Sequence, residues 1–257
     1  MFFERRAMAK TIRIKSELKQ EKRKALLSML FFLLLAVLSF MMSMYLFVLC
    51  FSDSSKMPLG VPVGVFALSA VFFVIYKLKH KDYMVLLSGV SGENEVLNIL
   101  KSLPGDFTVI MNPIINNRGK YNELDFAVIG KDAVFTVEVK NYKGALYGKS
   151  SSRELTQVKY GKGGKIYEKT VKNPVLQADF QGKRMRDLLY DLKIPFSVFP
   201  VLYFANESIE LQIENDKIYD CKIIKGENEL LEYIKKTHGK KITNFSDTKK
   251  LINSLKR

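Results

Sequence analysis

The chain has 257 residues, 47% of them hydrophobic, and its 41 Lys and Arg against 26 Asp and Glu give a formal net charge of +15 at pH 7. With only two cysteines, Cys50 and Cys221, the sequence excludes a disulfide framework and a CxxC metal site. The two histidines, His80 and His238, are distant in sequence and have no Cys or second His at ligand spacing, which argues against zinc binding and a Ser/His/Asp triad.

Two uncharged stretches near the N-terminus predict a transmembrane hairpin. They cover residues 25–52 and 57–76, and each reaches the roughly 20 apolar residues that cross a bilayer. The alternative is a buried core helix, which fits the second stretch better, because its start is weakened by Pro58, Gly60, Pro62 and Gly64. A short link at residues 52–56 would join the two spans.

Basic residues flank both predicted spans on the outer side of the hairpin. Lys and Arg outnumber Glu by nine to three in residues 1–24, and Lys77, Lys79 and Lys81 follow the second span. The positive-inside bias therefore predicts a multi-pass protein of the cell membrane with both termini in the cytoplasm. We expect a basic segment at 1–24, a membrane hairpin at 25–76 and a cytoplasmic domain at 77–257.

The predicted cytoplasmic domain alternates helical and strand-like patterns. Apolar residues spaced three and four apart predict helices, and runs of β-branched and aromatic residues predict strands. In chain order we expect a helix at 93–103, a strand at 107–115, a hairpin at 124–129 and 134–139, a second hairpin at 155–160 and 165–170, a helix at 173–192, strands at 196–204 and 221–224, and helices at 227–237 and 248–255. This order predicts an α/β domain with a mixed sheet flanked by helices.

The first hairpin carries two acids that can meet. If its turn is centred between Lys131 and Asp132, Asp125 lies opposite Glu138, and strand alternation puts Lys140 on the same face as Glu138. A loop of odd length would separate the acids. Opposed like charges destabilise a strand pair, and a hard cation such as Mg²⁺, which binds carboxylate oxygens, would relieve that repulsion.

Several short motifs occur in a fixed order along this domain. They are Gly92-Glu93, Glu123-Leu124-Asp125, Glu138-Val139-Lys140-Asn141-Tyr142 with Gly144, and Asn173-Pro174 with Gln177. In order and spacing the chain resembles, over about residues 89–204, the nuclease-related domain (NERD) family of the PD-(D/E)xK nuclease superfamily. One departure is Phe126, where many members carry His, which affects only an auxiliary contact.

This resemblance implies a restriction-endonuclease-like αβββαβ core and a set of site residues. Asp125 and Glu138 would bind Mg²⁺ or Mn²⁺, Lys140 would be the catalytic lysine, and Glu93 and Gln177 would be accessory catalytic residues, with Glu93 completing the metal shell. Each has a plainer alternative. The D…ExK pattern is common by chance, Glu93 alone is typical of a helix-capping acid, and Gln177 alone is typical of a solvated helix residue.

Residues 140–172 form a strongly basic insert, with nine Lys or Arg against two Glu. Basic and aromatic side chains there can follow a phosphate backbone and stack on bases. The expected nucleic-acid-binding residues are Lys149, Arg153, Lys159, Lys162, Lys165, Lys169, Lys172, Tyr160 and Tyr167. The alternative is a solvated hairpin that is also attracted to the anionic inner leaflet.

The sequence thus predicts a membrane-anchored, Mg²⁺- or Mn²⁺-dependent nuclease that hydrolyses nucleic acid, DNA more than RNA, at the cytoplasmic face. The alternative is a noncatalytic module that binds nucleic acid or another protein beside the membrane.

Overall fold

The structure is a computed structural model that describes residues 8–51, 57–117, 119–217, 219–241 and 244–256, with only the backbone of Lys162. The chain forms two compact units, one made of Ser16–Val90 and the other of Met1–Lys15 with Ser91–Arg257. The first seven residues and the predicted link at 52–56 lie outside the described residues.

The Ser16–Val90 unit contains two long apolar helices. Helix α1 spans Glu17–Cys50 and α2 spans Gly60–Lys101, and both are long and apolar enough to cross a membrane. They pack side by side in this unit, where the Ser43 hydroxyl donates to the Pro62 carbonyl at 2.9 Å and the rings of Phe40 and Phe66 lie 6.2 Å apart. In the most apolar 18-residue stretch of each helix, only 6% (α1) and 11% (α2) of the residues are buried, whereas a core helix of a soluble protein is mostly buried.

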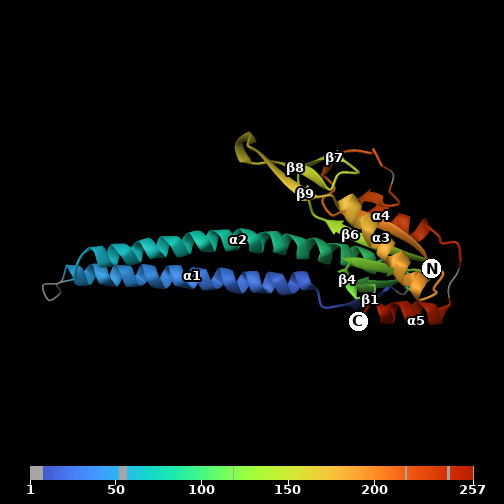
Figure 1. Cartoon of the computed structure of the whole chain (residues 1–257), viewed down its shortest axis with the longest axis horizontal. Helices are drawn as coiled ribbons and strands as arrows, with labels where there is room; N and C mark the ends of the chain where they lie inside the picture. The colour runs from blue at the N-terminus through green and yellow to red at the C-terminus, as the bar shows by residue number, and fades with distance from the viewer. Residues whose placement is uncertain (1–7, 52–56, 118, 218, 242–243, 257) are drawn as a thin grey trace, which may run out of the picture. The chain divides into compact units, whose positions relative to one another are not determined.

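The second unit is built on a six-stranded mixed sheet in the order β1-β2-β5-β6-β10-β12 (Figure 1). The strands are β1 (Lys10–Arg13), β2 (Thr108–Met111), β5 (Phe126–Ile129), β6 (Ala133–Lys140), β10 (Ser197–Phe204) and β12 (Lys222–Lys225). β1 is parallel to β2, β5 is antiparallel to both of its neighbours, and β6, β10 and β12 are parallel to one another. The N-terminal segment thus supplies an edge strand that the sequence patterns did not reveal.

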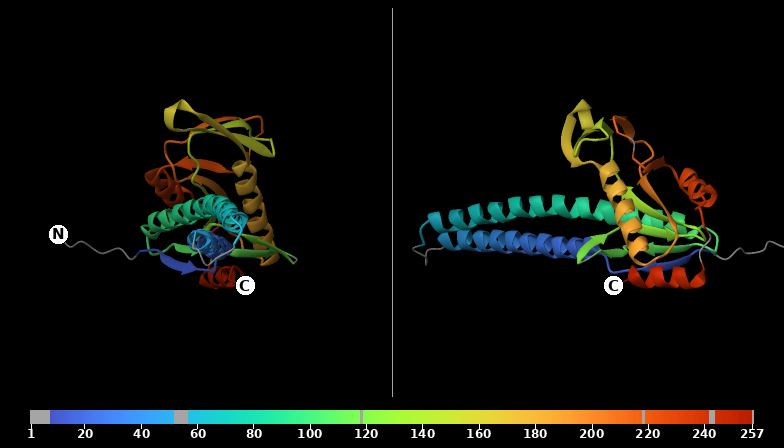
Figure 2. Two further views of the ribbon diagram at one scale, coloured as in Figure 1. Left: turned by 90° about the vertical axis from the view of Figure 1, so that its left-hand side faces the viewer. Right: turned by 45° about the vertical axis from the view of Figure 1, so that its right-hand side comes forward.

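Helices cover both faces of this sheet (Figure 2). On one face, the end of α2 and α4 (Glu227–Lys236) bury Leu97, Leu100 and Leu230 against odd-numbered residues of β6 such as Val137. On the other face, α3 (Pro174–Asp191) and α5 (Phe245–Ser254) cover even-numbered residues such as Val134. The even-numbered side chains of β6, including Glu138 and Lys140, therefore belong to the α3 face.

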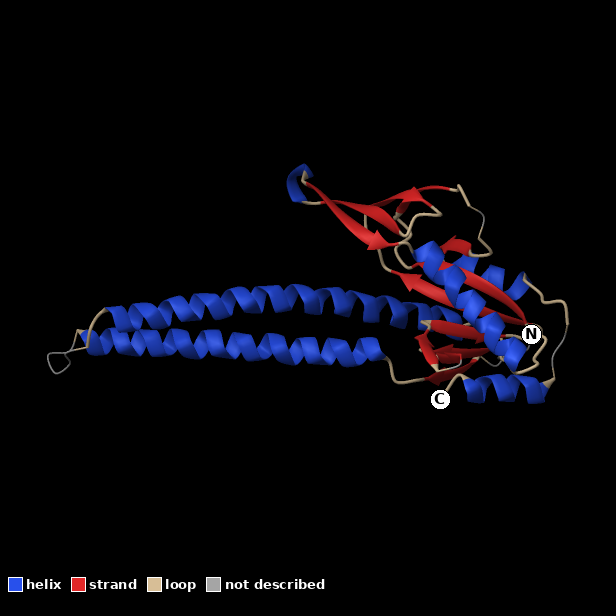
Figure 3. Cartoon of the chain, in the orientation of Figure 1, coloured by secondary structure: helices blue, strands red, loops and turns tan. Residues whose placement is uncertain are grey.

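A smaller sheet and a hairpin complete this unit (Figure 3). The four-stranded sheet has the order β11-β7-β8-β9, with β7 at Ala145–Lys149, β8 at Glu154–Tyr160, β9 at Ile166–Lys172 and β11 at Glu210–Glu214. A one-turn 3-10 helix, η1 (Lys162–Gly164), forms the tip between β8 and β9. β3 (Ile114–Asn117) and β4 (Lys120–Glu123) pair with each other.

The expected αβββαβ order is present as the end of α2, β2, β5, β6, α3 and β10. Two local expectations were wrong. The helix at 93–103 is the last part of α2, because Ser91 and Gly92 do not interrupt it. The strand at 107–115 breaks after Met111, where Asn112 has a positive φ of 56° and Pro113 offers no N–H for a ladder.

Candidate active site

The register of the β5–β6 hairpin is the one that the sequence predicts. Phe126 pairs with Val137 and Ile129 with Val134, and the Gly130 N–H donates to the Ala133 carbonyl at 2.9 Å to close an even-length loop. One residue beyond the ladder, this register brings Asp125 opposite Glu138.

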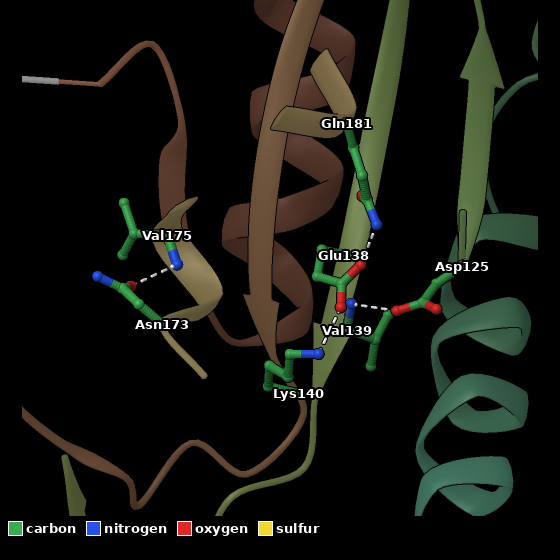
Figure 4. Close-up of polar contacts among 7 residues, drawn as sticks. All are labelled: Asp125, Glu138, Val139, Lys140, Asn173, Val175 and Gln181. Atoms are coloured by element: carbon green, nitrogen blue, oxygen red, sulfur yellow. Dashed lines mark hydrogen bonds and ion pairs between the residues drawn. The ribbon is translucent and has the colours of Figure 1, made fainter. Parts of the chain in front are cut away.

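Glu138 is the centre of a buried polar cluster on the α3 face (Figure 4). Its side chain is 2% exposed. One carboxylate oxygen accepts a hydrogen bond from the Lys140 ammonium, and the other accepts one from the Gln181 amide. The predicted placement of Glu138 and Lys140 on one face is therefore confirmed by their direct contact.

Asp125 reaches the same segment of β6 from the neighbouring strand. Its Oδ2 accepts a hydrogen bond from the Val139 N–H at 2.7 Å. Burial, together with the negative charge of Glu138, raises the pKa of Asp125 well above its usual value, against the opposing effects of Lys140 and the Val139 N–H. The two carboxylates repel each other in a weakly solvated site, so a proton or a cation stabilises them.

Lys140 is the positive charge at this site. Burial alone would lower the pKa of its ammonium, but the carboxylates of Glu138 and Asp125 outweigh that effect and raise it. The side chain keeps 18% of its surface exposed. Lys140 is therefore a proton-bearing cation at neutral pH that can still be reached from solvent.

The α3 residue that contacts Glu138 is Gln181, whereas the sequence predicted Gln177. Gln177 lies one helical turn earlier and is exposed, while Gln181 is 3% exposed. Gly182 explains the close approach of α3 at this point, because a Cβ there would lie 2.2 Å from Cγ of Pro200 on β10. Sequence reasoning missed Gln181, and the only signal was its i+4 spacing from Gln177.

Glu93 comes from a different element of the fold than the two central acids. It lies on α2, which covers the sheet face opposite to α3, and its Oε2 accepts a hydrogen bond from Asn112 at 3.4 Å. Its charge contributes only the weakest effect on the pKa of Asp125. Among the residues that the structure describes, no group of three or more His, Cys, Asp or Glu is arranged to hold a metal ion. A metal shell formed by Asp125, Glu138 and Glu93 stays a prediction.

The paired acids nevertheless present the donor chemistry that a hard cation requires. Asp125 and Glu138 supply carboxylate oxygens, and the side-chain oxygen of Gln181 is buried with no hydrogen-bond partner among the described residues. Mg²⁺ and Mn²⁺ prefer oxygen ligands of this kind. Asp125 and Glu138 are the residues that would hold such an ion, with Gln181 at their side.

The Asn173-Pro174 motif has a structural task in this fold. The Asn173 side chain caps α3 by accepting from the Val175 N–H at 2.9 Å, and its amide donates to the carbonyls of Ser150 and Ser152 at 2.9 and 2.8 Å. This residue therefore fixes the start of α3, the helix that carries Gln181, against the turn after β7.

The predicted nucleic-acid-binding residues do not form one surface. In the β8–β9 hairpin, Lys159 pairs with Tyr167 on the face that also carries Lys169. Paired residues share a face and neighbours along a strand alternate, so Tyr160 and Lys172 lie on the opposite face. The insert thus divides into two faces with different side chains.

Other predicted basic residues lie at the ends of these strands. Lys149 forms an exposed ion pair with Glu214 at 3.7 Å, Arg153 is exposed before β8, and Lys165 is exposed at the hairpin tip. The side chain of Lys162 lies outside the described residues. The Gly161 N–H donates to the Lys165 carbonyl at 2.7 Å and continues the β8–β9 register, so Lys165 shares the face of Lys159, whereas Lys149 belongs to the other face.

A separate cavity of about 290 Å³ lies beside α3. It is lined by Asn117, Lys120, Arg184, Asp187, Tyr190 and Asp191. Neither Asp125 nor Glu138 borders it, so the paired acids form a distinct site.

Comparison with known proteins supports the resemblance found in the motifs. Residues 88–205 match the model of the family described as "Nuclease-related domain", which confirms the similarity predicted for residues 89–204. An uncharacterized protein of Bacillus anthracis is 33% identical over 79 residues, a match that covers 30% of this chain and 37% of that protein. The chain thus spans little more than a third of this relative. No solved structure matches the chain significantly.

Proposed function

We propose that this chain, which matches the nuclease-related domain over residues 88–205, is a membrane-anchored nuclease that cleaves phosphodiester bonds of nucleic acid, DNA in preference to RNA. The observation that carries the proposal is the convergence of Asp125, Glu138 and Lys140 at the end of one hairpin. The basic insert and the two long apolar helices support the choice of substrate and the membrane anchor.

Each side chain has a distinct task in the proposed reaction. Asp125 and Glu138 would hold Mg²⁺ or Mn²⁺, which in such sites lowers the pKa of bound water and neutralises charge on phosphate oxygens. Lys140 keeps its proton, so it acts as a hydrogen-bond donor to a phosphate oxygen and stabilises the negative charge that develops there. Gln181 orients the Glu138 carboxylate through its amide.

The second candidate function is a noncatalytic nucleic-acid-binding module. It is favoured by the absence of a group of three metal-holding side chains among the described residues. In that case the acids near Lys140 would hold the lysine in place and no cleavage would follow.

Cleavage assays with the full-length protein in detergent micelles separate the two candidates. Labelled DNA and RNA are incubated with Mg²⁺, with Mn²⁺ or with a chelator, for the wild type, Asp125→Asn, Lys140→Met and a matched control, Lys235→Met. Lys235 is an exposed lysine on α4. We expect metal-dependent cleavage by the wild type and the control, and its loss in the other two variants. Binding without cleavage in either metal would reject the enzyme and support the module.

A further inference from the structure

The loop after β6 lies unusually close to the β8–β9 hairpin. Gly144 has a φ of +83°, and a Cβ at this position would lie 2.0 Å from the Val158 carbonyl oxygen. Only glycine fits such an approach. The amide of Gln157 fastens the same loop by donating to the Lys143 carbonyl at 2.8 Å. Lys143 is thereby held beside β8.

Three lysines meet where this loop crosses the hairpin. Lys159 and Lys169 lie on one face of β8–β9, since Lys159 pairs with Tyr167 and Lys169 pairs with Gln157. Lys143 completes the group, which we call the lysine cluster. Its three members come from the loop, from β8 and from β9.

The charges of the lysine cluster are not neutralised within the fold. All three side chains are exposed, and none forms an ion pair with a residue that the structure describes. Burial lowers the pKa of Lys159, and the charges of Lys169 and Lys143 lower it further. Like charges gathered by a fixed backbone favour an anionic ligand with several charges.

Tyr167 gives the same face an aromatic surface. It sits directly opposite Lys159, and its ring lies against the backbone of Gly161, where a Cβ would be 2.5 Å from the ring. The ring is held in place on that side while 56% of the residue remains exposed. A fixed, exposed ring beside cations is the arrangement on which unpaired bases stack.

We propose that the lysine cluster binds successive backbone phosphates of a single-stranded nucleic acid and that Tyr167 stacks on one of its bases. The inference rests on the proposed function and deepens it, because it specifies the strand form and the residues that hold it. Lys143 was not among the residues predicted to bind nucleic acid.

Chain geometry links the lysine cluster to the candidate active site. Lys143 follows Lys140 by three residues, so their Cα atoms are at most about 11 Å apart. Phosphates lie at least about 3.4 Å apart along a strand, so this span is covered by at most about three nucleotides. A strand held by the cluster would pass within reach of Lys140.

An anionic lipid surface would also attract these lysines, but Tyr167 is the one exposed large apolar side chain among the described residues of this face, and insertion among lipids takes a wider apolar surface. The exposed Ile166 and Tyr160 pair with each other on the opposite face of the hairpin. The lysine cluster and its face are therefore better suited to bind nucleic acid than lipid.

The test measures binding of labelled 20-nucleotide single strands and 20-base-pair duplexes to full-length protein in micelles, with chelator, over a series of salt concentrations. The variant is Lys143→Gln/Lys159→Gln/Lys169→Gln. Its control, Lys235→Gln/Lys241→Gln/Lys249→Gln, removes the same charge at three exposed lysines outside the basic insert. We expect the cluster variant to reduce the slope of log K against log salt by about 2, at about 0.7 per phosphate contact, and to weaken binding by at least about tenfold. The control should change the slope by less than about 1.

Tyr167→Ala tests the preference for a single strand. It should reduce the ratio of single-strand to duplex affinity by about tenfold, whereas Tyr160→Ala on the other face should leave this ratio unchanged. If Tyr167→Ala weakened the affinity for single strands and duplexes equally, or weakened neither, the stacking role of Tyr167 would be contradicted.

Two outcomes separate this inference from the proposed function. If the wild type binds no nucleic acid, the proposed function fails. If the wild type cleaves nucleic acid while the cluster variant binds as the control does, the lysine cluster fails and the nuclease stands. A third measurement is amine-modification footprinting. Protection of Lys143, Lys159 and Lys169 by single strands supports the inference, whereas protection by phosphatidylserine nanodiscs without nucleic acid overturns it in favour of lipid.

Discussion

Gln181 on α3 donates a hydrogen bond to the buried carboxylate of Glu138 on β6, across a separation of 43 residues in the chain. Lys140 holds the other oxygen of the same carboxylate. The orientation of this acid is therefore fixed jointly by a helix and by its own strand.

Replacing Gln181 with Ala should lower the rate of cleavage by about 10- to 100-fold, because the carboxylate loses the donor that orients it. Gln177→Ala on the exposed side of the same helix is the control and should stay within about twofold. Gln181→Ala should also lower the free energy of unfolding by about 1–3 kcal/mol, since a buried charged acceptor is left unsatisfied. Equal rates for the two variants would show that Gln181 has no part in positioning Glu138.

Asp125→Asn should change how stability depends on pH. The pKa of Asp125 is raised in the folded state, so the folded protein binds this proton more tightly than the unfolded chain. The contribution of Asp125 to stability is therefore greatest below its unfolded pKa of about 3.9 and is lost as pH rises towards the raised folded value.

The amide introduced by Asp125→Asn cannot ionise, yet its side-chain oxygen can still accept a hydrogen bond from the Val139 N–H, as the carboxylate does in the wild type. We expect the stability of the variant relative to the wild type to rise across that pH window by at most about 1.4 kcal/mol per pH unit. Denaturant titrations at a series of pH values measure this difference in the free energy of unfolding. If the free energy of unfolding changed with pH in the same way in both proteins, a raised pKa of Asp125 would be contradicted.

Mg²⁺ should stabilise only the wild type at neutral pH.

Gly182→Val should push α3 away from β10, because even a Cβ would lie 2.2 Å from Cγ of Pro200. We expect a loss of about 1–3 kcal/mol in the free energy of unfolding from overpacking, together with loss of cleavage as Gln181 moves from Glu138. Thermal unfolding followed by circular dichroism measures the first effect. Gln177→Val at an exposed position of the same helix tests whether valine in this helix is itself responsible.

Asn173→Ala and Asn173→Ser should separate the two roles of this side chain. Serine retains an oxygen that can cap α3 but loses the amide donors to Ser150 and Ser152. We expect the alanine variant to lose about 2–4 kcal/mol in the free energy of unfolding, combining a cap of about 1 kcal/mol with two hydrogen bonds of about 1 kcal/mol each. The serine variant should lose less. If both variants lose the same free energy, the cap does not contribute to stability.

For the predicted membrane segments and domain boundaries, the sequence indicated the long helices but not the strand that precedes them. The apolar stretches at 25–52 and 57–76 correspond to the long helices α1 and α2. The predicted basic segment at 1–24, however, contains β1, which pairs with β2 in the main sheet. A fragment beginning at residue 77 would therefore lack an edge strand. Nothing in the local pattern of Lys10–Arg13 indicates a partner located about a hundred residues later.

The sequence by itself determined the αβββαβ order of the core and the pairing of Asp125 with Glu138. Both depend on local properties, namely the period of apolar residues and the parity of one short loop. Only the tertiary structure decided that Gln181 contacts Glu138, that Glu93 comes from the helix covering the opposite face, and that Lys143 lies near Lys159 and Lys169. These outcomes depend on how closely α3 approaches β10 at Gly182 and how closely Gly144 approaches Val158. Such contacts join distant segments, and they follow from packing the whole core, which local sequence patterns do not encode.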